Sequence, residues 1–155
     1  MIRPLLAVVV LLAGVAAAQG RVTRAGTLKA ARLHHTATLL ADGRVLVVGG
    51  RGADGFTTLT SCELFEPKKA RWARCAPLGT ARSHHAATRL ADGRVLVTGG
   101  TTHDAQGGTN RFVALASAEL YDPAKDAWSP AAPMVEARNG HTATTRRLGT
   151  SLEVV

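Results

Sequence analysis

The sequence repeats itself, and this repeat constrains the fold more than any other feature. Residues 31–50 (ARLHHTATLLADGRVLVVGG) are largely identical to residues 81–100 (ARSHHAATRLADGRVLVTGG), at an offset of 50. Residues 61–78 match residues 117–134 at an offset of 56, because the second copy has six extra residues in the loop after its glycine pair. A fixed period of this length indicates an array of similar structural units.

Each copy predicts four short strands. Asp42-Gly43 predicts a two-residue type I′ hairpin, which needs positive φ at both central positions. A second short turn is expected at Lys68-Lys69, and no segment of the units keeps a 3.6-residue apolar period. The predicted strands of the first copy span residues 36–41, 44–50, 61–67 and 71–76. A four-stranded unit of about 50 residues has the size of a β-propeller blade.

The recurring elements also resemble a known repeat. They are, in order, R-x-x-H, D-G-R-V-L-V-x-G-G, S-x-E-L-[FY]-[DE]-P, a tryptophan and P-[LM]. This set resembles the kelch repeat, and the resemblance covers residues 26 to about 145, with Phe65 in the first copy where Tyr121 stands in the second. It implies an all-β kelch-type β-propeller fragment of about two and a half four-stranded antiparallel blades. It implies no single activity, because kelch propellers serve in binding and in some cases in catalysis.

The repeat sets the expected domain organisation. Two complete units are followed by a stub that diverges after Thr144, whereas closed propellers have about 4 to 8 blades. We expect a truncated reading frame; self-assembly of several chains into a ring and an open two-blade array are alternatives. The expected divisions are a signal peptide at 1–18, a short linker or closing strand at 19–25, kelch units at 26–80 and 81–136, and a partial, divergent unit at 137–155.

The first 18 residues resemble an export signal. Arg3 supplies a positive charge, an apolar run follows from Leu5 to Val15, and Ala16 to Ala18 complete a typical cleavage site. The apolar run of about 14 residues is shorter than the roughly 20 residues that span a membrane. We therefore expect cleavage after Ala18, no membrane span in the mature chain, and a secreted, periplasmic or cell-surface location.

Two other classes of partner are not expected. The net charge of +8 comes from basic residues that are scattered along the chain, which argues against a nucleic-acid partner. Gly50, Gly52 and Gly55 fit the dinucleotide-binding spacing G-x-G-x-x-G, but strand-like residues follow where such a loop needs a helix. The second copy keeps only the pair Gly99-Gly100, so we expect no bound cofactor.

Residues that recur once per blade are expected to be structural, because rotation about a propeller axis separates them. A zinc or copper site needs three or four convergent ligands. The histidines are therefore expected to make the same structural contact in each blade, such as a hydrogen bond to the backbone. The arginines and glutamates are expected to form salt bridges or backbone clamps. The structural repeat positions are Arg32, His35, Gly49, Gly50, Glu63, Trp72, Arg82, His85, Gly99, Gly100, Glu119, Tyr121, Trp128, Arg138 and His141.

The two cysteines are expected to form a disulfide. A turn centred between Lys68 and Lys69 places Cys62 opposite Cys75 and Phe65 opposite Trp72. Directly opposed residues in an antiparallel pair have Cα atoms about 4.5 to 5.5 Å apart, within reach of a disulfide. The second copy has alanine at both cysteine positions, and export implies an oxidising compartment.

The loops between the second and third strands differ most between the copies, and variable loops on a rigid scaffold commonly bind ligands. The candidate binding residues are Asp104, Gln106, Asn110 and Arg111. We expect an interaction module that binds a protein or an extracellular carbohydrate, without catalytic residues, cofactor or metal of its own. The alternatives are a fragment of a larger propeller enzyme of the galactose oxidase type and a non-functional truncated product. With Tyr121 as its single tyrosine, the chain cannot form the two-tyrosine copper site of that oxidase type.

Overall fold

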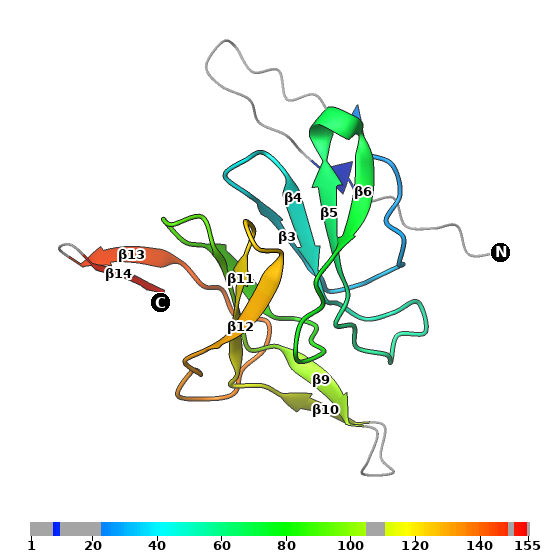
Figure 1. Ribbon diagram of the computed structural model, residues 1–155. Helices are drawn as coiled ribbons and strands as arrows, with labels where there is room; N and C mark the ends of the chain where they lie inside the picture. Colours follow the sequence, from blue (N-terminus) through cyan, green and yellow to red (C-terminus); the bar gives the residue numbers. More distant parts are fainter. Residues whose placement is uncertain (1–7, 10–22, 105–110, 149–150, 155) are drawn as a thin grey trace.

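Two four-stranded antiparallel sheets form the body of the protein (Figure 1). The computed structural model describes residues 8–9, 23–104, 111–148 and 151–154. Blade 1 has the strand order β3-β4-β5-β6 and blade 2 the order β7-β8-β11-β12. The strands of blade 1 are β3 (Thr36–Leu39), β4 (Val45–Val48), β5 (Cys62–Glu66) and β6 (Arg71–Cys75). Those of blade 2 are β7 (Ala86–Arg89), β8 (Val95–Thr98), β11 (Ala118–Asp122) and β12 (Ala127–Ala131).

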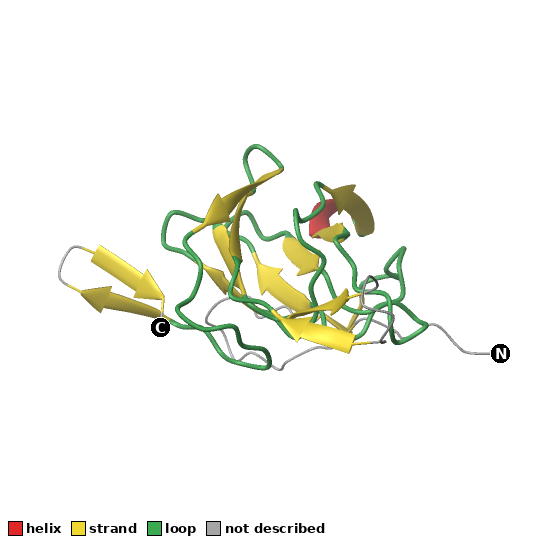
Figure 2. Ribbon diagram, turned by 90° about the horizontal axis from the view of Figure 1, so that it is seen from below, coloured by secondary structure: helices red, strands yellow, loops and turns green. Residues whose placement is uncertain are grey.

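The expected fold class, an all-β fragment of a β-propeller with four-stranded antiparallel blades, is confirmed. Among the described residues the only helical element is the 3-10 turn η1 (Pro67–Lys69), which joins β5 to β6. The β5–β6 register pairs Cys62 with Cys75 and Phe65 with Trp72, as the turn position predicts. In Figure 2 the strands are linked mainly by loops, with the β13–β14 hairpin set apart from the two sheets.

Three two-stranded pairs accompany the blades. Their strands are β1 (Val8–Val9) with β2 (Thr23–Arg24), β9 (Thr101–Asp104) with β10 (Arg111–Ala114), and β13 (Thr145–Leu148) with β14 (Ser151–Val154). Of the expected signal peptide, only the two residues of β1 are described. The expected linker or closing strand at 19–25 contains β2.

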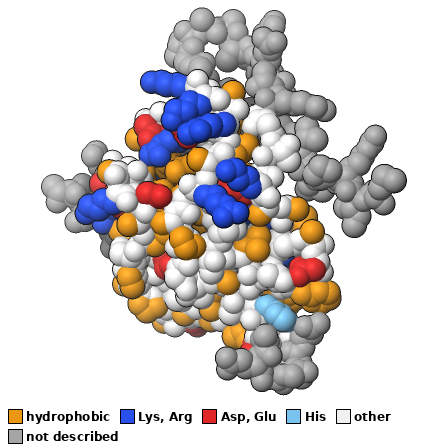
Figure 3. Space-filling view, turned by 45° about the vertical axis from the view of Figure 1, so that its right-hand side comes forward, with side chains coloured by type: hydrophobic (Ala, Val, Ile, Leu, Met, Phe, Trp, Pro, Cys, Tyr) orange, Lys and Arg blue, Asp and Glu red, His pale blue; other side chains and the backbone are white. Residues whose placement is uncertain are grey.

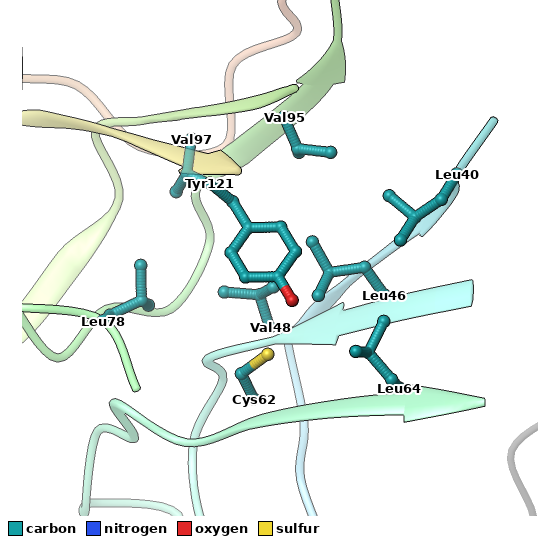
Figure 4. Packing of buried hydrophobic residues seen from close by; sticks show 9 residues of the cluster. All are labelled: Leu40, Leu46, Val48, Cys62, Leu64, Leu78, Val95, Val97 and Tyr121. Atoms are coloured by element: carbon teal, nitrogen blue, oxygen red, sulfur yellow. The ribbon is translucent and has the colours of Figure 1, made fainter. Parts of the chain in front are cut away.

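One hydrophobic cluster joins the two blades (Figure 4). Tyr121 of blade 2 is fully buried, and its ring lies over Leu46, Val48 and Leu64 of blade 1. The other members of the cluster are Leu40, Cys62, Leu78, Val95 and Val97. Alternate residues of β4 and β5 therefore face blade 2, as the two-residue period of a strand requires.

The opposite face of blade 1 is covered by the segment that precedes the first repeat. Ala25 is buried there with Val45, Val47, Phe65 and Trp72. The indole Nε1 of Trp72 donates a hydrogen bond of 2.7 Å to the carbonyl of Ala25. In blade 2 the indole of Trp128 donates in the same way to the carbonyl of Ala76, at 2.8 Å.

The predicted type I′ turn at Asp42-Gly43 is wrong. Gly43 has a φ of +85°, but Asp42 is not among the positive-φ residues. The amide of Gly43 donates to the carbonyl of Leu40 at 3.2 Å, which makes a β-turn with Ala41 and Asp42 at its centre. A turn of this kind followed by a left-handed glycine is a common three-residue hairpin loop. The Asp42 carboxylate stabilises it by accepting the amide of Arg44 at 3.0 Å.

The start of the third unit contacts the second unit as the start of the second contacts the first. The amide of Gly100 donates to the carbonyl of Arg138 at 2.9 Å, as the amide of Gly50 does to the carbonyl of Arg82 at 2.8 Å. Beyond Thr144, where the sequence diverges, β13 and β14 still pair as an antiparallel hairpin. Ser151–Val154 stands at the position that Val45–Val48 holds in the first repeat. Its partner β13 begins at Thr145, three positions after Thr142, the equivalent of Thr36, so the hairpin does not repeat the β3–β4 register.

Candidate functional site

A buried arginine closes the inner edge of each complete blade. The Arg32 guanidinium donates to the carbonyls of Gly49 and Ser61 at 2.8 and 3.0 Å, and to Glu63 Oε1 at 2.8 Å. The Glu63 carboxylate also accepts the backbone amides of Lys29 and Ala30. Arg32 therefore forms a salt bridge with Glu63 and also holds the backbone at two carbonyl groups.

Blade 2 repeats this arrangement almost atom for atom. Arg82 donates to the carbonyls of Gly99 and Ser117 at 2.7 and 3.0 Å, and to Glu119 Oε1 at 2.8 Å. The side chains of Arg32 and Arg82 are 0% exposed, whereas that of Arg138 in the third unit is 52% exposed and lies 3.4 Å from the Glu136 carboxylate. The Arg–Glu pairs of the two complete blades are therefore engaged in contacts inside the blades.

The glycine pairs allow neighbouring blades to approach closely. Gly49 and Gly50 have φ values of +60° and +103°. A Cβ atom on Gly49 would lie 2.5 Å from the carbonyl oxygen of Arg82, and one on Gly99 would lie 2.5 Å from that of Arg138. No helix follows in residues 51–61, so Gly50, Gly52 and Gly55 do not form the strand–turn–helix of a dinucleotide site.

The recurring histidines lie at the interfaces between units. His85 Nε2 lies 2.8 Å from Thr36 Oγ1 of blade 1, and His141 Nε2 lies 2.9 Å from Thr98 Oγ1 of blade 2. The partner is a hydroxyl of the preceding blade, not the backbone group that the sequence suggested. Burial, and then the positive charge of Arg82, lowers the pKa of His85 to about 3. Burial also lowers the pKa of His35 and of His141.

Tyr121 and Trp128 pack in blade 2 as Phe65 and Trp72 do in blade 1. The ring centroids of the two pairs are 4.9 and 5.2 Å apart. The phenol of Tyr121 donates to Asp126 Oδ1 at 2.7 Å, and burial, reinforced by this carboxylate, raises its pKa. This tyrosine is therefore held in its neutral form within the core.

The two cysteines form a disulfide across β5 and β6. Their Cα atoms are 5.2 Å apart, and 13 residues separate them in the chain. Cys62 is 2% exposed, so one half of the bond belongs to the hydrophobic core. The bond fixes the outer strand β6 to β5 at the end that is far from η1.

The variable loop of the second unit contains a hairpin. Strands β9 and β10 pair so that Asp104 lies opposite Arg111. Two of the four candidate binding residues, Gln106 and Asn110, lie outside the described residues. The hairpin projects from the lower side of the protein in Figure 1, beyond the ends of the blade strands.

The sequence did not indicate that five side chains beside this hairpin lie together. The rings of His34 and His84 are stacked, with centroids 3.8 Å apart and an interplanar angle of 22°. The guanidinium carbon of Arg51 lies 3.6 Å from the centroid of the Phe112 ring, and the His103 ring is 5.5 Å from that of Phe112. We call these five residues, His34, Arg51, His84, His103 and Phe112, the loop face.

The backbone holds the two stacked histidines in place. His34 and His84 have φ values of +55° and +54°, and the amide of His84 donates to the carbonyl of His34 at 3.1 Å. In the third unit the equivalent residue is Gly140, whose amide donates to the carbonyl of His84 at 2.8 Å. The alignment of a glycine with the two histidines is the sequence feature that could have indicated a left-handed backbone at this position.

Beneath the loop face a short hydrogen-bond chain joins the two units. The Arg51 Nε donates to Ser83 Oγ at 3.3 Å, and Ser83 Oγ lies 3.1 Å from Thr101 Oγ1. Burial, and then the charges of His34 and Arg51, lowers the pKa of His84. The loop face therefore combines a guanidinium, an aromatic ring and three imidazoles.

The described residues lack two further features. They contain no group of three or more histidine, cysteine, aspartate or glutamate side chains placed to hold a metal ion. Within the same residues, no helix has the length and apolar character that a membrane span needs.

The chain matches a known protein family. The model of the β-propeller of tRNA wybutosine-synthesizing protein 4 matches residues 29–151. A comparison with curated proteins found no match. The matched residues include both four-stranded sheets and most of the third unit, which is well over half of the chain. On this match and this fold, the chain belongs to the β-propeller family of tRNA wybutosine-synthesizing protein 4.

Proposed function

We propose that the protein is an exported kelch-type propeller module that binds a protein or an extracellular carbohydrate through the loop face, without catalysis of its own. The ordered glycine pair, S-x-E-L segment and tryptophan support the kelch assignment. The charged n-region, apolar run and alanine-rich end of residues 1–18 support export.

The observation that carries the proposal is a difference between two groups of polar residues, those buried within the blades and those on the loop face. The arginines and glutamates that recur in both complete blades are buried and hydrogen-bonded within the blades. The loop face uses Arg51, His103 and Phe112, which come from the part of the unit where the two copies differ. Side chains that vary on a repeated scaffold are the ones available for recognition.

The chemistry of the loop face fits a polar partner with hydroxyl or carbonyl groups. Arg51 supplies fixed N–H donors, and the Phe112 ring supplies an apolar face against which a sugar ring or a side chain can pack. Leu33, which directly precedes His34, is 42% exposed. Phe56, in the loop after Arg51, is 50% exposed.

A glycan array and a chemical crosslinking screen with the full-length protein test this proposal. We expect a glycan or protein ligand whose affinity falls about tenfold or more in Arg51→Ala/Phe112→Ala, because removing a central contact typically costs more than 1 kcal/mol. Lys68→Ala/Arg89→Ala, which removes two exposed cations away from the loop face, should bind like the unmodified protein.

tRNA belongs among the probes because it appears in the name of the matched family. Saturable tRNA binding that persists at physiological salt would contradict the proposal. A ligand that binds both double variants equally well would also contradict it, because the loop face would then not be the site.

A further inference from the structure

A pocket of about 380 Å³ opens on blade 1, away from the loop face. It lies where the segment after Leu28 passes the ends of β5 and β6. Its lining includes Lys29, Arg32, Glu63, Arg74 and the disulfide-bonded Cys75. None of the five residues of the loop face lines it. Its volume falls in the range of about 300 to 1,000 Å³ that is usual for small-molecule sites.

Within the described residues, two of the positive charges at this pocket form no ion pair, although Glu63 lies opposite Arg74 in the β5–β6 register. The Glu63 carboxylate is already engaged by Arg32 and by two backbone amides. Within the part of the chain that the structure describes, no carboxylate forms an ion pair with the side chain of Lys29 or of Arg74. Figure 3, which brings the right-hand side of Figure 1 forward, shows Lys and Arg side chains in groups, with Asp and Glu side chains among them.

The buried part of the pocket also has a polar atom without a partner. Arg32 uses both terminal nitrogens of its guanidinium, but its Nε is buried and makes no hydrogen bond within the described residues. The Nε of Arg82 is buried and unpartnered in the same way within the described residues, so this atom belongs to the clamp that both blades share and does not distinguish the pocket of blade 1.

Blade 2 shows that the scaffold does not require these charges. The repeat aligns Lys29 with Gly79 and Arg74 with Pro130, and the two cysteines with Ala118 and Ala131. The clamp formed by Arg82 and Glu119 is nevertheless retained with the same contacts. The cations and the disulfide are therefore additions of blade 1 to a shared framework.

The same comparison shows that a preceding blade would leave this position open. Blade 1 packs against blade 2, yet Gly79, Pro130 and Pro133, which match Lys29, Arg74 and Pro77, remain exposed. Any unit packed in the same way against blade 1 would leave Lys29 and Arg74 accessible.

We propose that this pocket binds an anionic group of a small ligand, a carboxylate, sulfate or phosphate, between Lys29 and Arg74. The planar guanidinium of Arg74 offers paired N–H donors to two oxygens of such a group, and the Lys29 ammonium supplies a second charge. The disulfide keeps β5 and β6, and with them Arg74, in fixed positions at the pocket.

Isothermal titration of the full-length protein with sodium sulfate, sodium phosphate and sodium galacturonate tests the proposal, with galactose as the neutral control. We expect at least one anion to bind and galactose not to bind. Lys29→Gln/Arg74→Gln should weaken anion binding by about tenfold or more, because a hydrogen bond to a charged group contributes about 1.5 to 3 kcal/mol. The anion that binds most tightly identifies the chemistry of the group.

Two control variants make the result specific. Lys68→Gln/Arg89→Gln makes the same change in net charge at exposed positions elsewhere and should leave anion binding unchanged. Arg51→Ala/Phe112→Ala should also leave it unchanged, which separates this pocket from the loop face. The proposal is overturned if no anion binds at millimolar concentration, if galactose binds as tightly as galacturonate, or if Lys68→Gln/Arg89→Gln weakens binding as much as Lys29→Gln/Arg74→Gln.

Discussion

The hydroxyl of Thr36 in blade 1 forms a hydrogen bond of 2.8 Å with Nε2 of His85 in blade 2. At the next interface the hydroxyl comes from a different strand. Thr36 lies opposite Val48, and the equivalent pair in blade 2 is Ala86 opposite Thr98. In blade 1 the threonine of this pair lies on the first strand, whereas in blade 2 it lies on the second. The hydroxyl of Thr98 forms a hydrogen bond of 2.9 Å with Nε2 of His141. What is kept is a hydroxyl within reach of the next histidine, whichever strand supplies it.

This exchange predicts a rescue. Thr36→Ala should lower the free energy of unfolding by about 1 to 2 kcal/mol, because it leaves a buried imidazole nitrogen without its partner. Thr36→Ala/Val48→Thr, which copies blade 2, should recover most of that loss. Urea unfolding of both variants and of Val48→Thr gives the coupling between the two positions. Additive losses in the double variant would contradict the role assigned to the hydroxyl.

The buried histidines predict a loss of stability in acid. The pKa of His85 is lowered to about 3 in the folded state, against an ordinary value of 6.5, so the unfolded chain binds a proton more readily. Its contribution is fully present above pH 6.5 and is lost as the pH falls from 6.5 towards 3, by at most about 1.4 kcal/mol per pH unit. Urea unfolding at pH 7, 5 and 4 measures this slope.

The variant His85→Gln should flatten the slope between pH 7 and 4, since it removes the group with the largest shift. His103→Gln, which removes a histidine from the loop face, serves as the control. If His85→Gln and the unmodified protein lose stability in parallel over this range, the slope does not come from His85.

We expect the same substitution of two recurring arginines to have unequal effects on stability. Arg82→Ala should destabilise the protein by about 3 to 5 kcal/mol, because it leaves Glu119 buried without its cation. Arg138→Ala should change stability by no more than about 0.5 kcal/mol, because its guanidinium is half-exposed. Unfolding midpoints in urea compare the two, and equal losses would show that the third unit uses its arginine as blade 2 does.

We expect the disulfide to stabilise blade 1. Cys62→Ala/Cys75→Ala, which copies the residues of blade 2, should lower the free energy of unfolding by about 2 to 3 kcal/mol, as expected for closing a loop of this length. Thiol titration of the denatured, unreduced protein should find no free thiol. Two free thiols per chain would refute the prediction.

Much of the fold could be predicted from the sequence, because contacts within a blade connect residues that are close in the chain. The period of the repeat, the turn at Lys68-Lys69 and the alternation of apolar residues together placed Cys62 opposite Cys75 and Phe65 opposite Trp72. The once-per-blade spacing of the arginines, glutamates and histidines also argued that these residues do not converge on one site. The turn at Asp42-Gly43 was mistaken because the dipeptide suits two hairpin types, and the strand register decides between them.

What only the tertiary structure decided lies between the units. The stack of His34 on His84, the cation of Arg51 over Phe112 and the threonine partners of His85 and His141 all join residues more than 40 positions apart. The sequence does not show which of these side chains meet, because each meets its partner only after two units pack. Thr36 aligns with Ala86, and Thr98 aligns with Val48, so the two threonines that bond the histidines are not equivalent positions of the repeat. The sequence by itself determined the blade, and the packing of one blade against the next determined which side chains form the loop face.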